Sequence, residues 1–311
     1  MKDSKLKKII VLSAFILLVI LIFFLISHKT TSTSKANINN SPTTESSLHS
    51  KKLPSQYTPV FDLTLESNII LIGNIETGNI VFQKNADQKT NAASITKLLS
   101  SAVILENVNT SNVIHIDKQQ YESLPSKTDL VLDEHIKVID LLKMALIMSS
   151  NDAINALANH LGYYEFLNLM NQKAKSIGMY NSHFDNPIGF DSIENYSTAL
   201  DLFQLGKYIY KHFPLIGEIT RSQAITITSL SNVKHLVVPT NLIIDKLENY
   251  WGGKTGTTPQ AKEALLAIFE FENNGKKYPY IVVIVQSDNR FSDIQKISEW
   301  LLANKPFLTN Y

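Results

Sequence analysis

The chain has 311 residues, and its 29 lysine and arginine residues almost balance 28 aspartate and glutamate residues, which leaves a net charge of +1. This balance argues against a nucleic-acid-binding protein, because such proteins carry a strongly basic surface. The chain contains no cysteine, which excludes disulfides, thiol catalysis and thiolate metal ligands. Its eight histidines lack the spacing of metal-binding motifs, so we expect neither a metal nor another cofactor.

The chain begins with a candidate membrane segment. Residues 9–26 are apolar apart from one serine, and as a helix they would cross about 27 Å of hydrocarbon. Four lysines lie within residues 2–8, and the positive-inside rule therefore places the amino terminus in the cytoplasm. We expect a cytoplasmic stub at 1–8 and an uncleaved transmembrane signal anchor at 9–26 that contacts the lipid bilayer. A cleaved signal peptide is the alternative, although its apolar core is usually shorter.

Residues 27–57 are rich in Ser, Thr, Asn and Lys and contain little that a core could bury. This composition predicts a flexible extracytoplasmic linker. The remaining residues, 58–311, are enough for one catalytic domain. The linker would hold this domain a short distance from the outer face of the membrane.

Within residues 58–311, hydrophobic patterns predict a mixture of strands and helices. In chain order they are strands at 68–74 and 79–82, helices at 93–107, 136–146, 152–161, 164–177 and 198–212, strands at 265–271 and 278–286, and a helix at 291–303. Strands at both ends with helices between them predict an α/β (α+β) domain. Its central antiparallel sheet would be flanked by helices and would carry an inserted helical lobe.

The first chemical motif is Ser-Ile-Thr-Lys at residues 94–97, at the start of a predicted helix. Ser94 and Lys97 are three residues apart, so their side chains would share one face of the helix and could meet. A serine nucleophile needs a base, and a lysine can act as one only when it is neutral. Burial and a nearby cation such as Lys254 would lower the Lys97 pKa toward that state. Taken alone, the pair is more typical of a helix N-cap followed by an exposed lysine.

The second motif is Ser-Ser-Asn at residues 149–151, between two predicted helices. Ser149 could pass a proton between Lys97 and a leaving amine. Asn151 could hold a substrate amide and orient Lys97. Helix capping and turn formation explain the segment equally well when it is considered alone.

The third motif is Lys-Thr-Gly at residues 254–256, which follows two glycines and precedes apolar residues of a strand. A lysine and a hydroxyl side by side could bind a substrate carboxylate. The glycine would let a peptide backbone approach the strand closely. A glycine turn before a strand is the alternative.

Each motif is a weak signal by itself. Ser-x-x-Lys also occurs at residues 4–7, 32–35 and 231–234, and a literal Ser-Asp-Asn occurs at residues 287–289, after the Lys-Thr-Gly motif. The informative feature is the order of the three motifs at a helix start, a helix junction and a strand. That order predicts acyl transfer through a serine ester.

Two further segments support this interpretation: Phe-Asp-Asn-Pro-Ile-Gly at 184–189 and Tyr-Ser-Thr-Ala-Leu-Asp at 196–201. With them, the chain from about residue 60 to 304 resembles the serine D-Ala-D-Ala carboxypeptidases, the low-molecular-weight penicillin-binding proteins of the peptidase S11 family. The resemblance implies a β-lactamase/transpeptidase-like fold and a catalytic domain outside a bacterial cell membrane. It implies peptidoglycan stem peptides ending in D-Ala-D-Ala as substrates and β-lactam antibiotics as covalent inhibitors.

The resemblance also implies roles for the motif residues. The catalytic residues would be Ser94 as the acylated nucleophile, Lys97 as its base, and Ser149. The substrate-binding residues would be Asn151, Lys254, Thr255, Gly256 and Thr257. Lys254 would recognise the terminal carboxylate of the substrate. The backbone N–H groups of Ser94 and Thr257 would form the oxyanion hole.

The sequence departs from the family pattern at two places. Ala92 replaces the proline that usually stands two residues before the nucleophile, and Ala-Lys at residues 261–262 replaces Ala-Gly after the third motif. Neither position carries a catalytic side chain, but both could alter the pocket. We also expect the carboxyl-terminal β-domain and membrane-binding helix of some members to be missing, with the amino-terminal anchor in their place.

Three other functions remain open on the sequence alone. A class A β-lactamase shares the motif order but needs a glutamate for deacylation, and the nearest candidate, Glu165, lies in a segment one residue too short and inside a predicted helix. A non-catalytic peptidoglycan-binding scaffold would have no need of Ser94. An endopeptidase that cleaves D-Ala-containing cross-links would use the same chemistry on a different bond.

Overall fold

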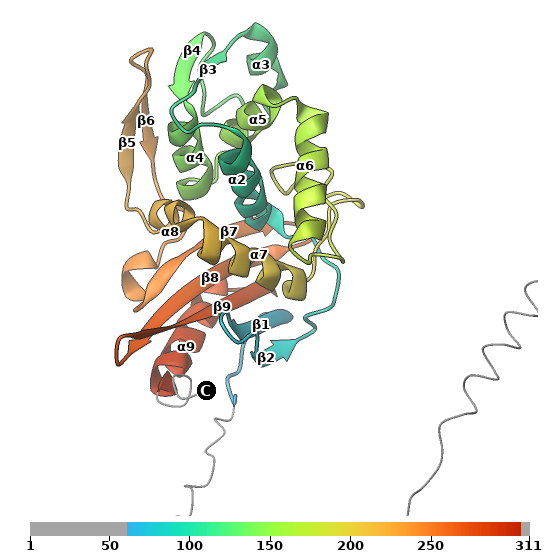
Figure 1. Cartoon of the computed structure of the whole chain (residues 1–311), viewed down its shortest axis with the longest axis vertical. Helices are drawn as coiled ribbons and strands as arrows, with labels where there is room; N and C mark the ends of the chain where they lie inside the picture. Colours follow the sequence, from blue (N-terminus) through green and yellow to red (C-terminus); the bar gives the residue numbers. More distant parts are fainter. Residues whose placement is uncertain (1–60, 306–311) are drawn as a thin grey trace, which may run out of the picture. The chain divides into compact units, whose positions relative to one another are not determined.

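The computed structural model describes residues 61–305 and places a helical lobe on one face of a sheet (Figure 1). The sheet has five antiparallel strands in the order β2-β1-β9-β8-β7. These strands are β1 (Ile69–Asn74), β2 (Ile80–Lys84), β7 (Tyr250–Thr258), β8 (Lys262–Asn273) and β9 (Lys276–Ser287). The two ends of the described chain therefore build one sheet, as the sequence predicted.

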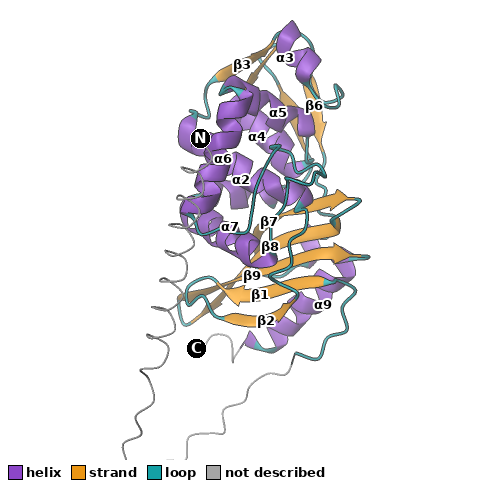
Figure 2. Ribbon diagram, turned by 90° about the vertical axis from the view of Figure 1, so that its right-hand side faces the viewer, coloured by secondary structure: helices purple, strands orange, loops and turns teal. Residues whose placement is uncertain are grey.

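Both faces of the sheet are covered, which explains its nearly continuous apolar strands. Along β1, Ile69 and Leu71 point into the core shared with the helical lobe, whereas Ile70 and Ile72 point into a second core. The helix α9 (Arg290–Ala303) closes this second core on the opposite face (Figure 2). Burial of each such aliphatic side chain contributes about 1.5–3 kcal/mol.

The residues between β2 and β7 form the helical lobe. Its larger helices are α2 (Thr96–Asn107), α4 (Val138–Ile147), α5 (Asn151–His160), α6 (Tyr163–Ser176), α7 (Ala199–His212) and α8 (Pro214–Thr220). The first nine residues of α2, through Ile104, are all buried, so this helix lies inside the lobe. A helix surrounded by protein can hold a polar side chain away from water. The first motif overlaps the start of α2, because Lys97 is the second residue of this helix.

Smaller elements cap the far end of the lobe, and the sequence analysis missed them. They are β3 (Val113–Ile116), α3 (Lys118–Ser123), β4 (Glu134–Lys137), β5 (Ile225–Thr228) and β6 (Lys234–Val237). The 3-10 turn η2 (Ile244–Lys246), also missed, lies before β7, and the flanking residues Ile243 and Leu247 belong to the second core. The helix expected at 136–146 begins only at Val138, because the preceding residues pair with β3. Strands of four residues carry too short a pattern to be distinguished from loops.

The predicted anchor at 9–26, the linker at 27–57 and two of the four Ser-x-x-Lys copies lie outside the described residues. Among the helices within residues 61–305, none combines the length and apolar character needed to cross a membrane.

Candidate active site

The three motifs come together where the helical lobe meets β7, the edge strand of the sheet. Ser94 lies in the 3-10 turn η1 (Ala93–Ile95), Ser149 lies between α4 and α5, and Lys254 lies within β7. Ser94 was expected in the first turn of an α-helix, but α2 begins two residues later. The Lys-Thr-Gly motif is part of a strand and not a turn before one.

The backbone before the nucleophile is held in a strained conformation. Ala93 has φ +48°, a left-handed value that non-glycine residues avoid, and such residues cost about 1–3 kcal/mol. The Ala93 N–H donates to Oδ1 of Asn91 over 2.6 Å, which supports this conformation. Strain of this kind is common at functional sites, where the surrounding structure fixes a residue in a useful orientation.

Two glycines allow neighbouring segments to pack against this turn. A Cβ atom on Gly189 would lie 1.9 Å from the carbonyl oxygen of Ala93, and one on Gly256 would lie 2.8 Å from the backbone nitrogen of Ser94. The first glycine ends the 184–189 segment and the second belongs to β7. Close approach of both segments to η1 therefore requires glycine at both positions.

Lys97 is fully buried, and its Nζ contacts three neutral oxygen atoms. They are Ser94 Oγ at 2.8 Å, Asn151 Oδ1 at 2.8 Å and the carbonyl oxygen of Ile188 at 3.0 Å. Burial lowers the pKa of Lys97 to about 7. A neutral amine can donate to the amide and carbonyl oxygens and accept the hydroxyl proton of Ser94, which is the geometry of a nucleophile with its base.

Lys254 is the second buried lysine of the site. Its Nζ donates to Ser149 Oγ at 2.9 Å and to the carbonyl oxygen of Thr255 at 3.0 Å. Burial, and then the charges of Lys97 and Arg290, lower the pKa of Lys254 well below its usual value. We predicted that burial and Lys254 would together lower the pKa of Lys97. Burial accounts for the lowered pKa of Lys97, and the charge of Lys97 contributes to the lowered pKa of Lys254.

The helix junction divides its roles among three residues. Ser150 Oγ accepts from the N–H of Ala153 over 3.1 Å and caps α5. Ser149 has φ +65°, and its hydroxyl contacts Lys254 and not Lys97. Asn151 contacts Lys97 directly. Capping therefore accounts for the middle residue of the motif and leaves the two outer side chains to meet the lysines.

The sequence analysis missed two residues that contact β7. The guanidinium of Arg290 donates through one nitrogen to the carbonyl oxygen of Gly256 and to Oγ1 of Thr257, both at 2.7 Å. Thr240 Oγ1 lies 2.6 Å from Thr255 Oγ1. Neither residue belongs to a motif, and no local pattern distinguishes them. The charge of Arg290 contributes to the lowered pKa of Lys254.

Other candidates from the sequence lie elsewhere. Ser231 accepts from the backbone N–H of His135, and Lys234 is exposed on β6, so this Ser-x-x-Lys copy is structural. Glu165, the candidate β-lactamase glutamate, is exposed on α6. Within residues 61–305, no three His, Asp or Glu side chains are grouped so that they could hold a metal ion.

The two departures from the family pattern have structural explanations. Ala92 is buried and has φ −88°, close to the range that a proline ring imposes. Lys262 has φ +48°, a left-handed conformation that favours glycine. Its Nζ pairs with Asp288 at 2.8 Å, and both side chains are exposed.

Comparison with known proteins identifies the family. Residues 55–288 match the model of Peptidase S11, the D-alanyl-D-alanine carboxypeptidases. The chain belongs to this family. It is 30% identical over 256 residues to the D-alanyl-D-alanine endopeptidase of Escherichia coli, a match that covers 78% of this chain and 79% of that protein. It is 26% identical to the D-alanyl-D-alanine carboxypeptidase DacA of Haemophilus influenzae over 78% of this chain, and it spans only 63% of that protein's length.

A solved structure supports the same assignment. Penicillin-binding protein D2 of Listeria monocytogenes, solved in its ampicillin-bound form, is 26% identical and superposes with a TM-score of 0.65 over 76% of this chain and 98% of that one. The penicillin-binding fold of this peptidase S11 protein, with its antiparallel sheet and helical lobe, is therefore the one that the resemblance implied.

Proposed function

We propose that this protein is a serine D-Ala-D-Ala carboxypeptidase that removes the terminal D-alanine from peptidoglycan stem peptides through an ester on Ser94. One observation carries the proposal. A fully buried lysine with a pKa of about 7 lies 2.8 Å from the hydroxyl of Ser94. A lysine of that pKa is substantially neutral at physiological pH and can accept the serine proton.

In the first half of the reaction, Ser94 Oγ attacks the carbonyl carbon of the penultimate D-alanine while Lys97 takes the hydroxyl proton. The negative charge on the carbonyl oxygen would be stabilised by the backbone N–H groups of Ser94 and Thr257. The close contact of Gly256 with the Ser94 nitrogen supports this pairing. The C–N bond then breaks, a proton passes to the departing amine, and D-alanine leaves. Ser149, which bonds to Lys254, is placed to take part in that transfer.

In the second half, water attacks the ester and its proton returns through Lys97, which frees the Ser94 hydroxyl. Asn151, at 2.8 Å from Lys97, would keep the base oriented and hold the substrate amide. The cations around β7 would bind the free carboxylate of the substrate. Lys254 and Thr255 would supply the contacts, while Arg290, which donates to Gly256 and Thr257, would hold these residues in position.

A β-lactam would be attacked by the same serine and would form an ester on Ser94. Its amine would not depart, because the opened ring keeps the amine attached to the acyl group. The ampicillin-bound form of the Listeria relative supports this expectation. A class A β-lactamase would also need a carboxylate to activate water. No carboxylate of the described residues contacts Ser94 or Lys97, and Glu165 is exposed. We therefore expect a penicillin ester to persist.

An endopeptidase is the second candidate, because the 30% identical relative from E. coli carries that name. The chemistry would be the same, and only the group after the scissile bond would differ.

We further propose that residues 9–26 anchor the protein in a bacterial cell membrane, with residues 58–311 as an extracytoplasmic catalytic domain joined to it by 27–57. The apolar run and its flanking lysines support this arrangement.

The deciding experiment measures intact mass after incubation with benzylpenicillin, followed by D-alanine release from a stem pentapeptide and from a cross-linked dimer. We expect a stable adduct of one penicillin and release from the pentapeptide, and neither with Ser94→Ala. Rapid turnover of penicillin would support a β-lactamase. Cleavage of the dimer alone would support an endopeptidase, and an unmodified, inactive wild type would support a scaffold.

A further inference from the structure

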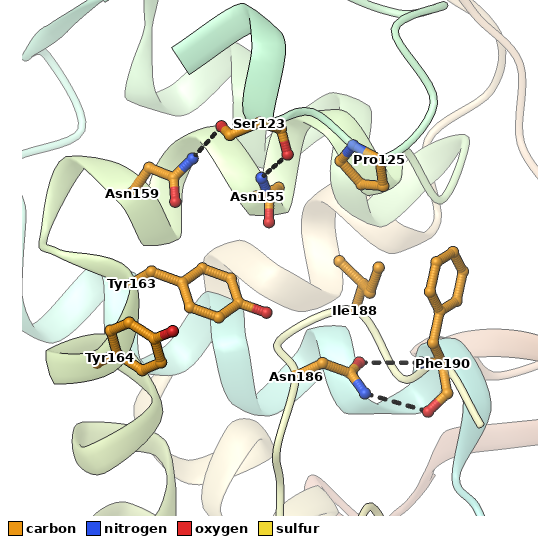
Figure 3. A pocket seen from close by; sticks show the side chains of 9 residues that line it. All are labelled: Ser123, Pro125, Asn155, Asn159, Tyr163, Tyr164, Asn186, Ile188 and Phe190. Atoms are coloured by element: carbon orange, nitrogen blue, oxygen red, sulfur yellow. Dashed lines mark hydrogen bonds between the residues drawn. The ribbon is translucent and has the colours of Figure 1, made fainter. Parts of the chain in front are cut away.

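A hollow lies beside the catalytic residues, between α5, α6 and the segment that follows residue 184 (Figure 3). It has a volume of about 470 Å³. We call it the tyrosine pocket, and its principal lining residues are Ser123, Asn155, Asn159, Tyr163, Tyr164 and Phe190. None of the residues that line it carries a charge. The 184–189 segment contributes Asn186 and Ile188 to its wall.

The tyrosine pocket is within reach of a substrate bound at Ser94. Asn155 follows Asn151 by one turn of α5, an offset of about 6 Å along the helix. Ile188, whose carbonyl oxygen contacts Lys97, is also part of the pocket wall. An extended peptide of four residues covers up to about 14 Å. The stem of a substrate held at Ser94 can therefore bring the group attached to its amino terminus to this pocket.

Polar atoms in the pocket are fixed in direction but have no partner. Asn155 Nδ2 donates to the carbonyl oxygen of Ser123 at 3.0 Å, and Asn159 Nδ2 donates to Ser123 Oγ at 2.8 Å. These bonds turn both amide oxygens toward Tyr163 and the interior of the pocket (Figure 3). Within residues 61–305, no group donates to either oxygen, and the Tyr163 hydroxyl has no hydrogen-bond partner. Burial raises the pKa of Tyr163, so its hydroxyl stays protonated and can donate.

These groups fit a neutral ligand that carries hydroxyl or amide groups and an apolar ring face. Two amide oxygens can accept from such groups, and the Tyr163 hydroxyl can donate to them. Tyr164 is 82% exposed at the rim and offers a ring face for stacking. A carboxylate would find no cation among the residues that line the pocket, and burying one unpaired is costly. The negatively charged parts of a stem peptide are therefore poor candidates.

A neighbouring hollow of about 430 Å³ extends the pocket away from Ser94. The two share Ser123, Asn159 and Tyr163, and the second adds the amide side chains of Gln119 and Gln120 and the carboxylate of Asp117, which accepts from the N–H of Gln120. The hollows thus form one groove lined mainly by amides and aromatic rings, with one carboxylate in the part away from Ser94. Its length suits a ligand made of more than one ring.

We propose that the tyrosine pocket binds an uncharged N-acetylhexosamine unit of the glycan to which the stem peptide is attached. The identification of the ligand as part of the substrate rests on the proposed peptidase function. The preference for an uncharged sugar rests only on the residues that line the pocket. The acetamido group would use the amide oxygens and the Tyr163 hydroxyl, and the sugar ring would stack on Tyr164. The pocket would therefore give a preference for peptides that are still attached to glycan.

The first test titrates the full-length protein with tri-N-acetylchitotriose, which carries no peptide, by calorimetry or NMR. We expect saturable binding that Tyr164→Ala weakens about fivefold, the size of one lost aromatic contact. Tyr163→Phe should also weaken it, and cellotriose, which lacks acetamido groups, should bind less well. Tyr180→Ala, at a tyrosine that is 79% exposed and outside the pocket, is the matched control. Absence of saturable binding, or equal binding by Tyr164→Ala, overturns the proposal.

The second test compares kcat/KM for a free pentapeptide with that for the same peptide on a disaccharide. We expect the ratio in favour of the glycan-linked substrate to fall about fivefold in Tyr164→Ala and to stay unchanged in Tyr180→Ala. An unchanged ratio in Tyr164→Ala, with equal losses on both substrates, would assign the pocket to the peptide and contradict the proposal. If wild type releases D-alanine from neither substrate, the peptidase function fails, and the chitotriose titration still decides the sugar site.

Discussion

Two segments of this protein have nearly the same residues and opposite uses. Ser-Ser-Asn at 149–151 precedes α5, and Ser-Asp-Asn at 287–289 precedes α9. In each, one residue caps the helix. Ser150 accepts from the N–H of Ala153, and Asn289 accepts from the N–H of Ser292, both at 3.1 Å. The segments differ in what their other side chains contact.

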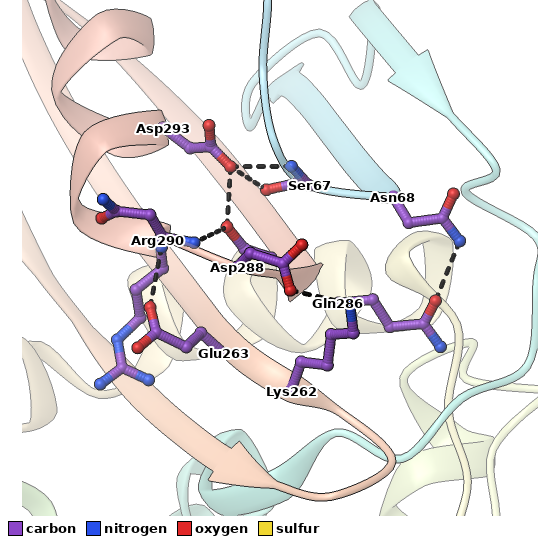
Figure 4. A network of polar contacts seen from close by, with 10 residues as sticks. Ser67, Asn68, Lys262, Glu263, Gln286, Asp288, Arg290 and Asp293 are labelled. Carbon is purple, nitrogen blue, oxygen red and sulfur yellow. Dashed lines mark hydrogen bonds and ion pairs between the residues drawn. The ribbon is translucent and has the colours of Figure 1, made fainter.

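At 287–289 the serine and aspartate side chains have complementary partners, in the polar network drawn in Figure 4. Ser287 donates to the buried carboxylate of Asp293 at 2.8 Å, and Asp288 pairs with Lys262 at the surface. The Asp293 carboxylate also accepts from the backbone N–H groups of Glu66 and Ser67, each at 2.9 Å, and from the Ser67 hydroxyl. These bonds tie the start of the described domain to its last strand and helix.

At 149–151 the outer side chains contact two buried lysines that no carboxylate neutralises. A network that satisfies a buried charge stabilises the fold. Buried cations left without an opposite charge are costly and are kept where chemistry needs a shifted pKa. The comparison predicts that mutations at the first segment change activity and those at the second change stability.

The largest effect is expected from Lys97→Met, which removes the amine and keeps most of the packing. We expect kcat/KM for D-alanine release to fall about 10³-fold, within the range for loss of a general base. The midpoint of thermal unfolding should change little, because removal of a costly buried amine offsets the loss of its hydrogen bonds to Asn151 and Ile188. Lys234→Met, in the structural Ser-x-x-Lys copy, is the control and should keep full activity. If Lys97→Met kept more than a tenth of wild-type activity, Lys97 would not be the general base for Ser94.

Asp293→Ala should have the next largest effect, and it should act on stability. The change leaves several buried donors without their acceptor, and we expect a loss of about 3 kcal/mol in the free energy of unfolding. Urea unfolding measures this loss. Activity per folded molecule in the cold should stay near that of wild type. A loss below 1 kcal/mol would mean that the network does not stabilise the fold as its geometry indicates.

The pH dependence of acylation tests the state of Lys97 directly. Because only the neutral amine can accept the Ser94 proton, the rate should rise with pH and level off above a midpoint near 7. For a single group with that pKa, the rate at pH 8 should exceed the rate at pH 6 about tenfold. Stopped-flow acylation by a fluorescent penicillin measures the profile. A profile without a midpoint between pH 6 and 8 would be inconsistent with burial as the control of this lysine.

A variant separates burial from charge coupling as the cause. If burial lowers the pKa of Lys97, the midpoint should stay near 7 in Lys254→Met, although substrate binding should weaken. A clear rise of the midpoint in that variant would mean that the charge of Lys254 also lowers the pKa of Lys97, as the sequence predicted.

The sequence was sufficient to predict the main helices and the strands at both ends of the domain, because the apolar patterns of these elements are long. It failed where the structure depends on distant contacts. The sequence placed the Lys-Thr-Gly motif at a strand but gave no bounds for β7, since Gly252 and Gly253 with the polar residues after them lack a strand pattern. The motif order predicted that Ser94, Lys97 and Asn151 meet, whereas Ser149 contacts Lys254 instead of Lys97. Arg290 came with no local signal. Its role arises only because the start of α9 packs beside Gly256 and Thr257.

The smallest effect is expected at Lys262, next to the structural segment. Its φ of +48° costs a non-glycine residue about 1–2 kcal/mol, while glycine adds about 0.4–1 kcal/mol of unfolded-state entropy. Lys262→Gly should therefore stabilise the backbone by about 0.5 kcal/mol. The substitution also removes the exposed ion pair between Lys262 and Asp288. Urea unfolding should therefore compare the single variant Asp288→Ala with the double variant Lys262→Gly/Asp288→Ala, because the ion pair is absent from both proteins. A destabilised double variant would mean that the lysine side chain supports this turn in a way that its φ does not reveal.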